Sequence, residues 1–235
     1  MPDEQPTGRS IRDRLAIALD FPDLDRAEQL AKEVSPWFGV AKVGLELYSA
    51  AGPEAISRMR ALDLEVFADI KLHDIPTTVG RAARVLGRQG IRYLNFHAAG
   101  GTDMLRAGVE GLAEGARDGG FSPATPIAVT VLTSDPDPSA FPARLQGAVD
   151  AGCDGVVCSA FEVAASAAAG MRTMVPGIRP AGAAHDDQAR VATPAAAIAN
   201  GASWLVIGRA VTAAPDPAAA AASIHAEVEA ALAGD

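Results

Sequence analysis

Short apolar segments alternate with helix-like segments along almost the whole chain, and this alternation limits the possible folds more than any other feature. Apolar runs of this kind, bounded by turn residues, are typical of parallel strands that are buried on both faces. We expect eight of them, at residues 15–20, 39–44, 67–72, 93–97, 126–132, 154–159, 173–176 and 204–208. Strand–helix units repeated in this way within 235 residues predict an α/β protein, a (β/α)8 or TIM barrel.

An open, doubly wound α/β sheet is the alternative architecture. A dinucleotide-binding sheet of that type carries the pattern G-x-G-x-x-G directly after its first strand, and this chain lacks the pattern there. The composition does not change along the chain in a way that suggests a second domain. We therefore expect one barrel domain over residues 14–235, preceded by a flexible arm over residues 1–13, which are rich in proline, glycine and charge.

The net charge of −9 argues against nucleic acids and anionic membranes as partners, because no cluster of lysine or arginine stands out. A small anionic substrate remains compatible, since a local site can be basic on an acidic protein. No apolar run is long enough to cross a membrane, and the polar N-terminus is unlike a signal peptide. The two cysteines, Cys153 and Cys158, form neither a disulfide framework nor a zinc signature. We therefore expect a cytoplasmic protein.

The segment 67–78 begins as an apolar strand and ends as a loop, with charged residues at the crossing. Side chains alternate along a strand, so Asp69 and Lys71 are expected on one face. Pro76 ends the strand, which leaves Asp74 in the exit loop, free to turn toward Lys71 or toward a neighbouring subunit. A buried lysine among carboxylates is costly unless the charges pair, and such sites are frequently functional. A surface ion pair at a strand end is the alternative.

Polar residues recur at the ends of other expected strands, where TIM barrels place their active sites. They are Asp20, Lys42, His97 and Thr133. His97 is as readily a structural hydrogen-bonding residue as a catalytic one, and we leave it out of the catalytic set.

The end of the chain's last expected strand carries the features of a phosphate site. Gly208 and Arg209 follow that strand where a helix should begin, and backbone N–H groups at such a place bind phosphate. The long loop 177–192 adds Arg179 and Gln188, and its length suggests a functional lid.

Several motifs together resemble the orotidine 5′-phosphate decarboxylase family, most closely its bacterial form. They are Asp20, the segment 42–44, the segment DIKLHDIPTT at 69–78, and the segments 132–134, 176–180 and 207–209. The resemblance extends from about residue 14 to residue 217, and no expected motif residue is replaced. It implies a homodimeric barrel that converts orotidine 5′-monophosphate to UMP and CO₂ in pyrimidine biosynthesis, with no metal and no organic cofactor.

The resemblance also implies a role for individual residues. Lys71 would protonate C6 of the pyrimidine, and Asp69 would lie against the substrate carboxylate. Lys42 and Asp74 would complete an alternating row of charges, and Asp74 and Thr78 would reach the neighbouring subunit's site. The remaining implied contacts to substrate are Asp20 and Lys42 to the ribose, Thr133 to the pyrimidine, and Arg179, Gln188, Gly208 and Arg209 to the phosphate, with Ile75 and Pro176 also at the substrate.

The chemistry of the residues agrees with this implication. Loss of CO₂ leaves a carbanion with no obvious electron sink, so a cation must be fixed beside it. Lys71 can be both this cation and the proton donor, and flanking carboxylates would keep it charged.

Two other functions remain open. A sugar-phosphate lyase of the hexulose-phosphate synthase or keto-gulonate-phosphate decarboxylase type would use Mg²⁺, and Lys42 argues against it because a cation is ill placed beside a metal. A non-catalytic phosphate-binding barrel would not need to bury Lys71 between carboxylates.

Overall fold

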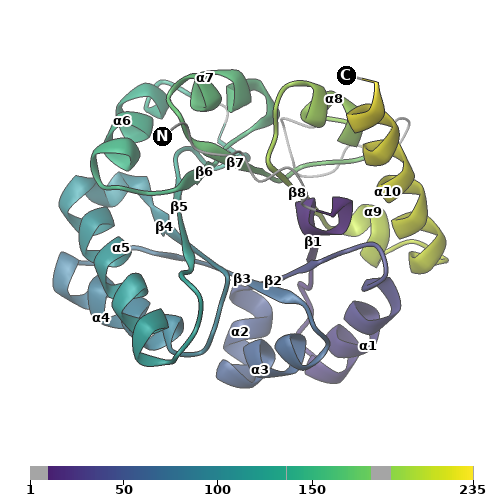
Figure 1. The fold of residues 1–235 in the computed structure, drawn as a ribbon, viewed down its shortest axis with the longest axis horizontal. Coiled ribbons are helices and arrows are strands. Elements are labelled where there is room, and N and C mark those ends of the chain that lie inside the picture. Colours follow the sequence, from purple (N-terminus) through teal and green to yellow (C-terminus); the bar gives the residue numbers. More distant parts are fainter. Residues whose placement is uncertain (1–9, 136, 181–191, 235) are drawn as a thin grey trace.

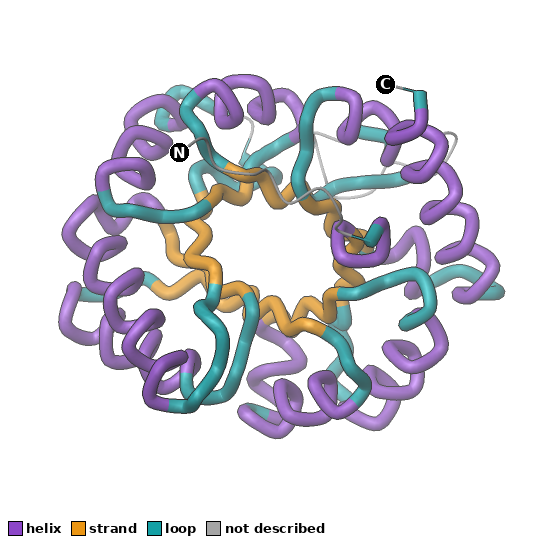
Figure 2. The backbone as a smooth tube through the Cα atoms, viewed as in Figure 1, coloured by secondary structure: helices purple, strands orange, loops and turns teal. Residues whose placement is uncertain are grey.

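Eight parallel strands close into a barrel in the computed structural model, which describes residues 10–135, 137–180 and 192–234. Each strand pairs with the next, and β8 pairs with β1. Figure 1 looks along the barrel, and Figure 2 shows the ring of strands with the helices outside it. The predicted (β/α)8 barrel is therefore confirmed, and the open doubly wound sheet is excluded. The strands are β1 (Leu15–Ala18), β2 (Val40–Gly44), β3 (Glu65–Leu72), β4 (Tyr93–His97), β5 (Thr125–Val129), β6 (Gly155–Val157), β7 (Arg172–Val175) and β8 (Trp204–Ile207).

Helices follow the strands and cover the outside of the barrel (Figure 1). The α-helices are α1 (Leu24–Val34), α2 (Leu45–Ala51), α3 (Pro53–Ala61), α4 (Pro76–Gly87), α5 (Gly101–Asp118), α6 (Phe141–Asp150), α7 (Val163–Ala168), α8 (Pro194–Ala199), α9 (Arg209–Thr212) and α10 (Pro217–Ala233). The short 3-10 helices among the described residues are η1 (Ile11–Arg14), η2 (Ala98–Gly100) and η3 (Ala160–Glu162). In the part of the chain that the structure describes, no helix is both long and apolar enough to span a membrane.

The ordered barrel begins earlier than the sequence suggested. We expected residues 1–13 to form a flexible arm, but residues 11–13 belong to η1, which contacts β1, β2 and β8. The backbone N–H of Gly39 donates to the carbonyl of Arg12 at 2.6 Å, so this turn is tied to the start of β2. Residues 1–9 lie outside the described residues.

Strand ends differ from the expected limits in places that affect the site. The first strand ends at Ala18, so Asp20 lies in the loop beyond it. The fifth strand ends at Val129 rather than at residue 132, and Leu132 is exposed. The loops that follow these two strands carry Asp20 and Thr133, two of the residues predicted for the site.

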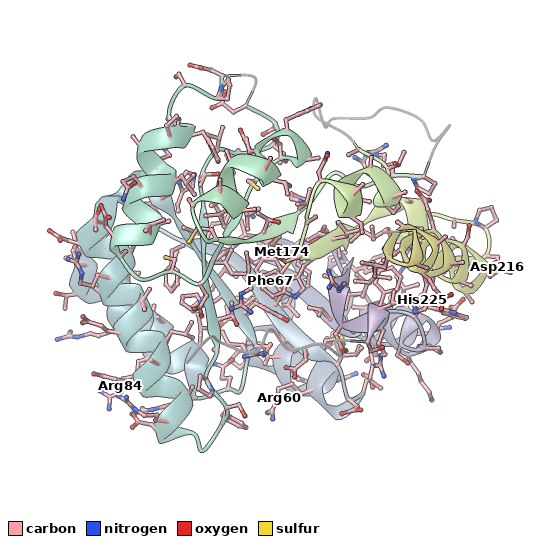
Figure 3. The ribbon with its side chains drawn as sticks, turned by 45° about the horizontal axis from the view of Figure 1, so that its top comes forward. Arg60, Phe67, Arg84, Met174, Asp216 and His225 are labelled. Carbon is pink, nitrogen blue, oxygen red and sulfur yellow. The ribbon has the colours of Figure 1, made fainter. Side chains whose placement is uncertain are left out.

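Aromatic and apolar side chains fill the inside of the barrel below the strand ends. Phe67 and Tyr93 meet edge to face with ring centroids 6.3 Å apart, and Tyr93 and Trp204 do so at 5.2 Å. Figure 3 shows Phe67 and Met174 in the interior, with Arg84 at the outer surface. The polar side chains further along β3 and β4, such as Asp69 and Asn95, therefore lie at one end of a packed apolar core inside the barrel.

Helices α4 and α5 pack with their backbones in close approach because glycines face one another. A Cβ atom on Gly111 would lie 2.1 Å from the carbonyl oxygen of Gly80, and one on Gly115 would lie 2.1 Å from that of Arg84. Both distances are impossible for real atoms, so these positions require glycine. Packing at Gly111 and Gly115 holds α5 against α4, the helix that begins directly after residues 69–75.

Candidate active site

The carboxyl ends of the strands surround one pocket of about 640 Å³, a volume suited to a small organic ligand. Nine of the residues that the sequence predicted for the site line it: Asp20, Lys42, Asp69, Lys71, Thr133, Pro176, Arg179, Gly208 and Arg209. They come from loops and strands spread over the whole chain, as expected for a TIM-barrel site. Apolar side chains, among them Phe67, Val129 and Val206, line the pocket beside them.

An irregularity in β3 brings Asp69 and Lys71 together. Ala68 pairs with Leu94 and Leu72 pairs with Phe96, so the register shifts across the residues between them. Within this bulge Lys71 has a φ of 49°, which is unusual for a residue with a side chain. The ammonium nitrogen of Lys71 lies 2.5 Å from Oδ1 of Asp69. Unusual backbone geometry of this kind concentrates at functional sites.

Lys42 joins this pair to Asp20. Its Nζ lies 2.9 Å from Asp20 Oδ1 and 3.3 Å from Asp69 Oδ2. Burial alone would lower the pKa of Lys42, but the charges of Asp69 and Asp20 outweigh it and raise the pKa. Burial likewise would raise the pKa of Asp69, yet Lys42, Lys71 and a hydrogen bond from Asn95 lower it. Four charged groups thus form a continuous chain, Asp20–Lys42–Asp69–Lys71.

Asn95 is a site residue that the sequence analysis missed. It lies on β4, is fully buried, and holds both members of the Asp69–Lys71 pair. Its Oδ1 accepts from the backbone N–H of Lys71 at 2.7 Å, and its Nδ2 donates to Asp69 Oδ1 at 2.7 Å. One polar residue between the apolar Leu94 and Phe96 was the signal that could have found it.

The opposite side of the pocket carries the residues expected to bind phosphate. Gly208 lies at the N-terminus of α9. A Cβ atom added to it would come no closer than 3.7 Å to any neighbour, so the protein's own packing leaves this backbone accessible. Arg209 and Arg179 line the same pocket, and the bridge between Ile178 and Ala192 closes the base of the loop that carries Arg179. Gln188, expected in this group, lies outside the described residues, as do residues 181–191 of the expected lid.

Three predicted residues lie away from the pocket of their own chain. Asp74, Ile75 and Thr78 are exposed and do not line it. Asp74 accepts a hydrogen bond from the backbone N–H of Ile75 at 2.7 Å. Among the described residues it makes no ion pair with Lys71, so of the two directions that the sequence left open for Asp74, the turn toward Lys71 of the same chain is not seen.

The two histidines at the ends of β3 and β4 stack on one another. The ring centroids of His73 and His97 are 5.4 Å apart, and the rings are 26° from parallel. Burial, followed by the charges of His73, Arg144 and Lys71, lowers the pKa of His97. His97 Nδ1 accepts from the N–H of Ala99 at 3.3 Å, in agreement with a neutral, structural role.

The acidic residues of the pocket do not fit a divalent metal. Two of its three carboxylates, those of Asp20 and Asp69, contact the ammonium of Lys42, which stands where a cation would be held; the third belongs to Glu46. Within the described ranges there is no group of three or more acidic, histidine or cysteine side chains placed to bind a metal.

Comparison with known proteins supplies an independent line of evidence. The sequence profile of the family described as orotidine 5′-phosphate decarboxylase / HUMPS matches residues 13–224. The chain is 47% identical to an orotidine 5′-phosphate decarboxylase of Anaeromyxobacter sp. (strain K), over 91% of this chain and 97% of that protein. It is 46% identical to the corresponding protein of Moorella thermoacetica, over 93% of each.

Solved structures of the same description share the fold. The crystal structure of orotidine 5′-phosphate decarboxylase from Lactobacillus acidophilus superposes with a TM-score of 0.79 at 32% identity, covering 92% of this chain and 99% of that one. The enzyme from Pyrococcus horikoshii gives a TM-score of 0.73 at 26% identity, with 92% and 99% covered.

Proposed function

The chain belongs to the orotidine 5′-phosphate decarboxylase / HUMPS family, and we propose that it is the enzyme that removes CO₂ from orotidine 5′-monophosphate to give UMP in pyrimidine biosynthesis. The observation that carries this proposal is the chain of ion pairs Asp20–Lys42–Asp69–Lys71 along one wall of the pocket. Burying charged groups costs desolvation free energy, and binding a phosphate ester does not require four of them in a row. Stabilising a carbanion does require a fixed positive charge beside it.

Lys71 is the proposed proton donor. When the bond between C6 and the carboxylate breaks, CO₂ leaves and the electron pair remains on C6. The ammonium of Lys71 would stabilise this charge and then donate a proton to C6, giving UMP and a neutral amine that is reprotonated from water. Its ammonium nitrogen lies 2.5 Å from Asp69 Oδ1, so the proposed donor is held in place before the reaction.

Asp69 would face the substrate carboxylate. Two unit charges about 4 Å apart interact by about 4 kcal/mol at an effective dielectric constant near 20. The repulsion between Asp69 and the bound carboxylate would be relieved as CO₂ departs, which adds to the stabilisation by Lys71. We favour Lys71 as the larger contribution because it acts where the charge develops.

The remaining pocket residues are proposed to bind the distant parts of the substrate. Asp20 and Lys42 would hold the ribose hydroxyls, and Thr133, with Pro176, the pyrimidine. Arg179, Gln188, Gly208 and Arg209 would bind the phosphate. Binding energy from a remote phosphate can be used to hold the reacting carbon against Lys71.

We propose that the working enzyme is a homodimer in which Asp74, Ile75 and Thr78 enter the site of the second copy. Their exposure, outside the pocket of their own chain, supports this arrangement. Two large apolar side chains are also exposed after neighbouring strands, Leu45 at 58% and Ile75 at 66%. Exposed apolar groups next to a site are typical of a contact surface.

We also propose that residues from 14 onward form a single catalytic domain and that the protein is cytoplasmic. Both cysteines are free and buried, and burial raises the pKa of each thiol to about 12, which favours persistent reduced thiols.

The alternative within the family is a Mg²⁺-dependent sugar-phosphate lyase. The position of Lys42 between the two carboxylates argues against it. The test is the ultraviolet absorbance of orotidine 5′-monophosphate mixed with the purified protein in EDTA. We expect the orotate band to disappear as UMP forms. An unchanged spectrum in EDTA, with turnover of a sugar phosphate after Mg²⁺ is added, would overturn the proposal in favour of the alternative.

A further inference from the structure

We propose that Asn95 is the positioning residue of the Asp69–Lys71 pair, setting both the backbone of the lysine and the orientation of the carboxylate. This inference rests on the proposed function, because its consequence is a change in turnover. Asn95 does not line the pocket and is fully buried, so it would act through its two neighbours and not by touching the substrate.

The strand ladder between β3 and β4 is interrupted beside Asn95. Between the Ala68–Leu94 and Leu72–Phe96 pairs, β3 has more residues than β4, and the regular pairing of backbone groups stops. A buried backbone N–H must still find an acceptor. That of Lys71 finds the side chain of Asn95, with Oδ1 at 2.7 Å. The asparagine side chain therefore takes the place of a main-chain acceptor at the bulge.

The hydrogen bond from Lys71 to Asn95 also maintains an unusual backbone conformation. Lys71 has a φ of 49°, a region that costs energy for a residue with a Cβ atom and persists only where the surroundings hold it. The hydrogen bond to Asn95 is such a restraint. In this conformation the ammonium meets Asp69 from only two residues away along the same strand.

The side-chain amide of Asn95 can have only one orientation between these two partners. The backbone N–H of Lys71 only donates, and an ionised Asp69 carboxylate only accepts. Asn95 accepts from the first and donates to the second, at 2.7 Å in each case. A carboxylate at this position would repel Asp69, and an apolar side chain would leave two polar groups without this partner.

The charged and titratable groups around Asn95 are those of the site. β3 supplies Asp69 and Lys71, β2 supplies Lys42, which contacts Asp69, and β4 itself supplies His97. On β5 the residue paired with Asn95 is the apolar Ile127. Burial and the charge of Asp69 would raise the pKa of a carboxyl group introduced here, whereas Lys42 and Lys71 would lower it. Because both ammonium groups are already paired with Asp69, we expect the net shift to be upward.

Two variants test the inference. Asn95→Ala removes both hydrogen bonds, and we expect kcat for orotidine 5′-monophosphate to fall by roughly 10- to 100-fold while the Kd for UMP changes by less than about threefold. Asn95→Asp keeps the shape of the side chain but loses its donor when ionised. When protonated, its hydroxyl can donate to Asp69 while its carbonyl accepts from Lys71. We expect the ratio of its kcat to that of the wild type to rise by at least about tenfold between about pH 8 and about pH 5.5.

The matched control is Thr130→Val. Thr130 is also fully buried and donates a side-chain hydrogen bond, to the carbonyl of Val157 at 3.1 Å, but contacts neither Asp69 nor Lys71. We expect its kcat to stay within about twofold of wild type, because the loss of a buried hydrogen bond by itself does not disturb the pair.

The outcomes separate the inference from the function. If the wild type does not act on orotidine 5′-monophosphate, the proposed function fails and the inference with it. If the wild type is active and Asn95→Ala retains its kcat, or Thr130→Val loses as much, only the inference is overturned. Should Asn95→Ala fail to fold, Asn95→Asp decides: a ratio that rises on acidification supports the inference, and a ratio that is flat overturns it.

Discussion

Asp69 and Lys71 lie two residues apart on the same strand, yet their side-chain charges are only 2.5 Å from each other. The bulge in β3 and the φ of 49° at Lys71 make this contact possible. A regular strand would direct both side chains the same way without joining their ends. The pair is therefore formed before any substrate enters, and much of the reorganisation that a charged transition state demands has already been made during folding.

Gly44 leaves room for the Asp20–Lys42 pair in its observed position. A Cβ atom there would lie 2.6 Å from Asp20 Oδ1 and 2.9 Å from Lys42 Nζ. We expect Gly44→Ala to displace both charged groups and to lower kcat/KM by roughly 10- to 100-fold in steady-state assays. Gly147→Ala is the control. Gly147 lies on the outer helix α6, and a Cβ atom added there would meet only Thr102 Oγ1, at 3.3 Å. Equal activity of the two variants would refute the steric role of Gly44.

Arg209 is predicted to act on the phosphate alone. We expect Arg209→Ala to reduce kcat/KM for orotidine 5′-monophosphate by roughly 100-fold, because a charge-assisted hydrogen bond is lost. Turnover of the nucleoside orotidine should hardly change. Arg106→Ala removes an exposed arginine that pairs with Asp103 on α5, and serves as the control for charge loss. Equal losses on both substrates would remove Arg209 from the phosphate site.

Mixing inactive subunits tests whether Asp74 serves a second copy. Lys71→Ala and Asp74→Ala should each be nearly inactive alone. In a hybrid dimer, however, one site receives an intact Lys71 from one subunit and an intact Asp74 from the other. After random exchange of subunits we expect about a quarter of wild-type activity to return. A mixture that stays inactive although hybrids are seen by native mass spectrometry would show that the site is not shared.

The lowered pKa of His97 should make the free energy of unfolding depend on pH. Burial and nearby positive groups lower the pKa of His97 in the folded chain, so below its ordinary pKa near 6.5 the unfolded chain binds the proton more readily. The free energy of unfolding should therefore decrease as the pH falls through this value. We expect His97→Gln to lose less stability than the wild type between about pH 7.5 and about pH 5.5 in urea titrations. Identical losses in both proteins would contradict this assignment.

The barrel and most of the site could be predicted because their signals are local. Eight apolar runs gave the strands, and charged residues at their ends gave Asp20, Lys42, Asp69 and Lys71, which the structure brings into one pocket. Strand ends share one edge of a parallel barrel, so residues far apart in sequence meet there.

The role of Asn95 and the position of Asp74 could not be predicted, because they depend on the three-dimensional path of the chain and not on residue type. The contact of Asn95 with Lys71 exists only because β3 bulges, and the bulge is visible in the register and not in the composition. Similarly, Asp74 lies outside the pocket of its own chain, in the loop that leads into α4. Residue types alone allowed Asp74 to turn either way.

Lys71→Ala tests the central claim most directly. The measurement is the loss of orotate absorbance in EDTA, together with the affinity for UMP by calorimetry. The account predicts that kcat falls by at least about 10⁴-fold, because proton donor and stabilising charge are lost together, while UMP binding stays within about tenfold. Turnover within tenfold of the wild type by a folded variant would contradict the account.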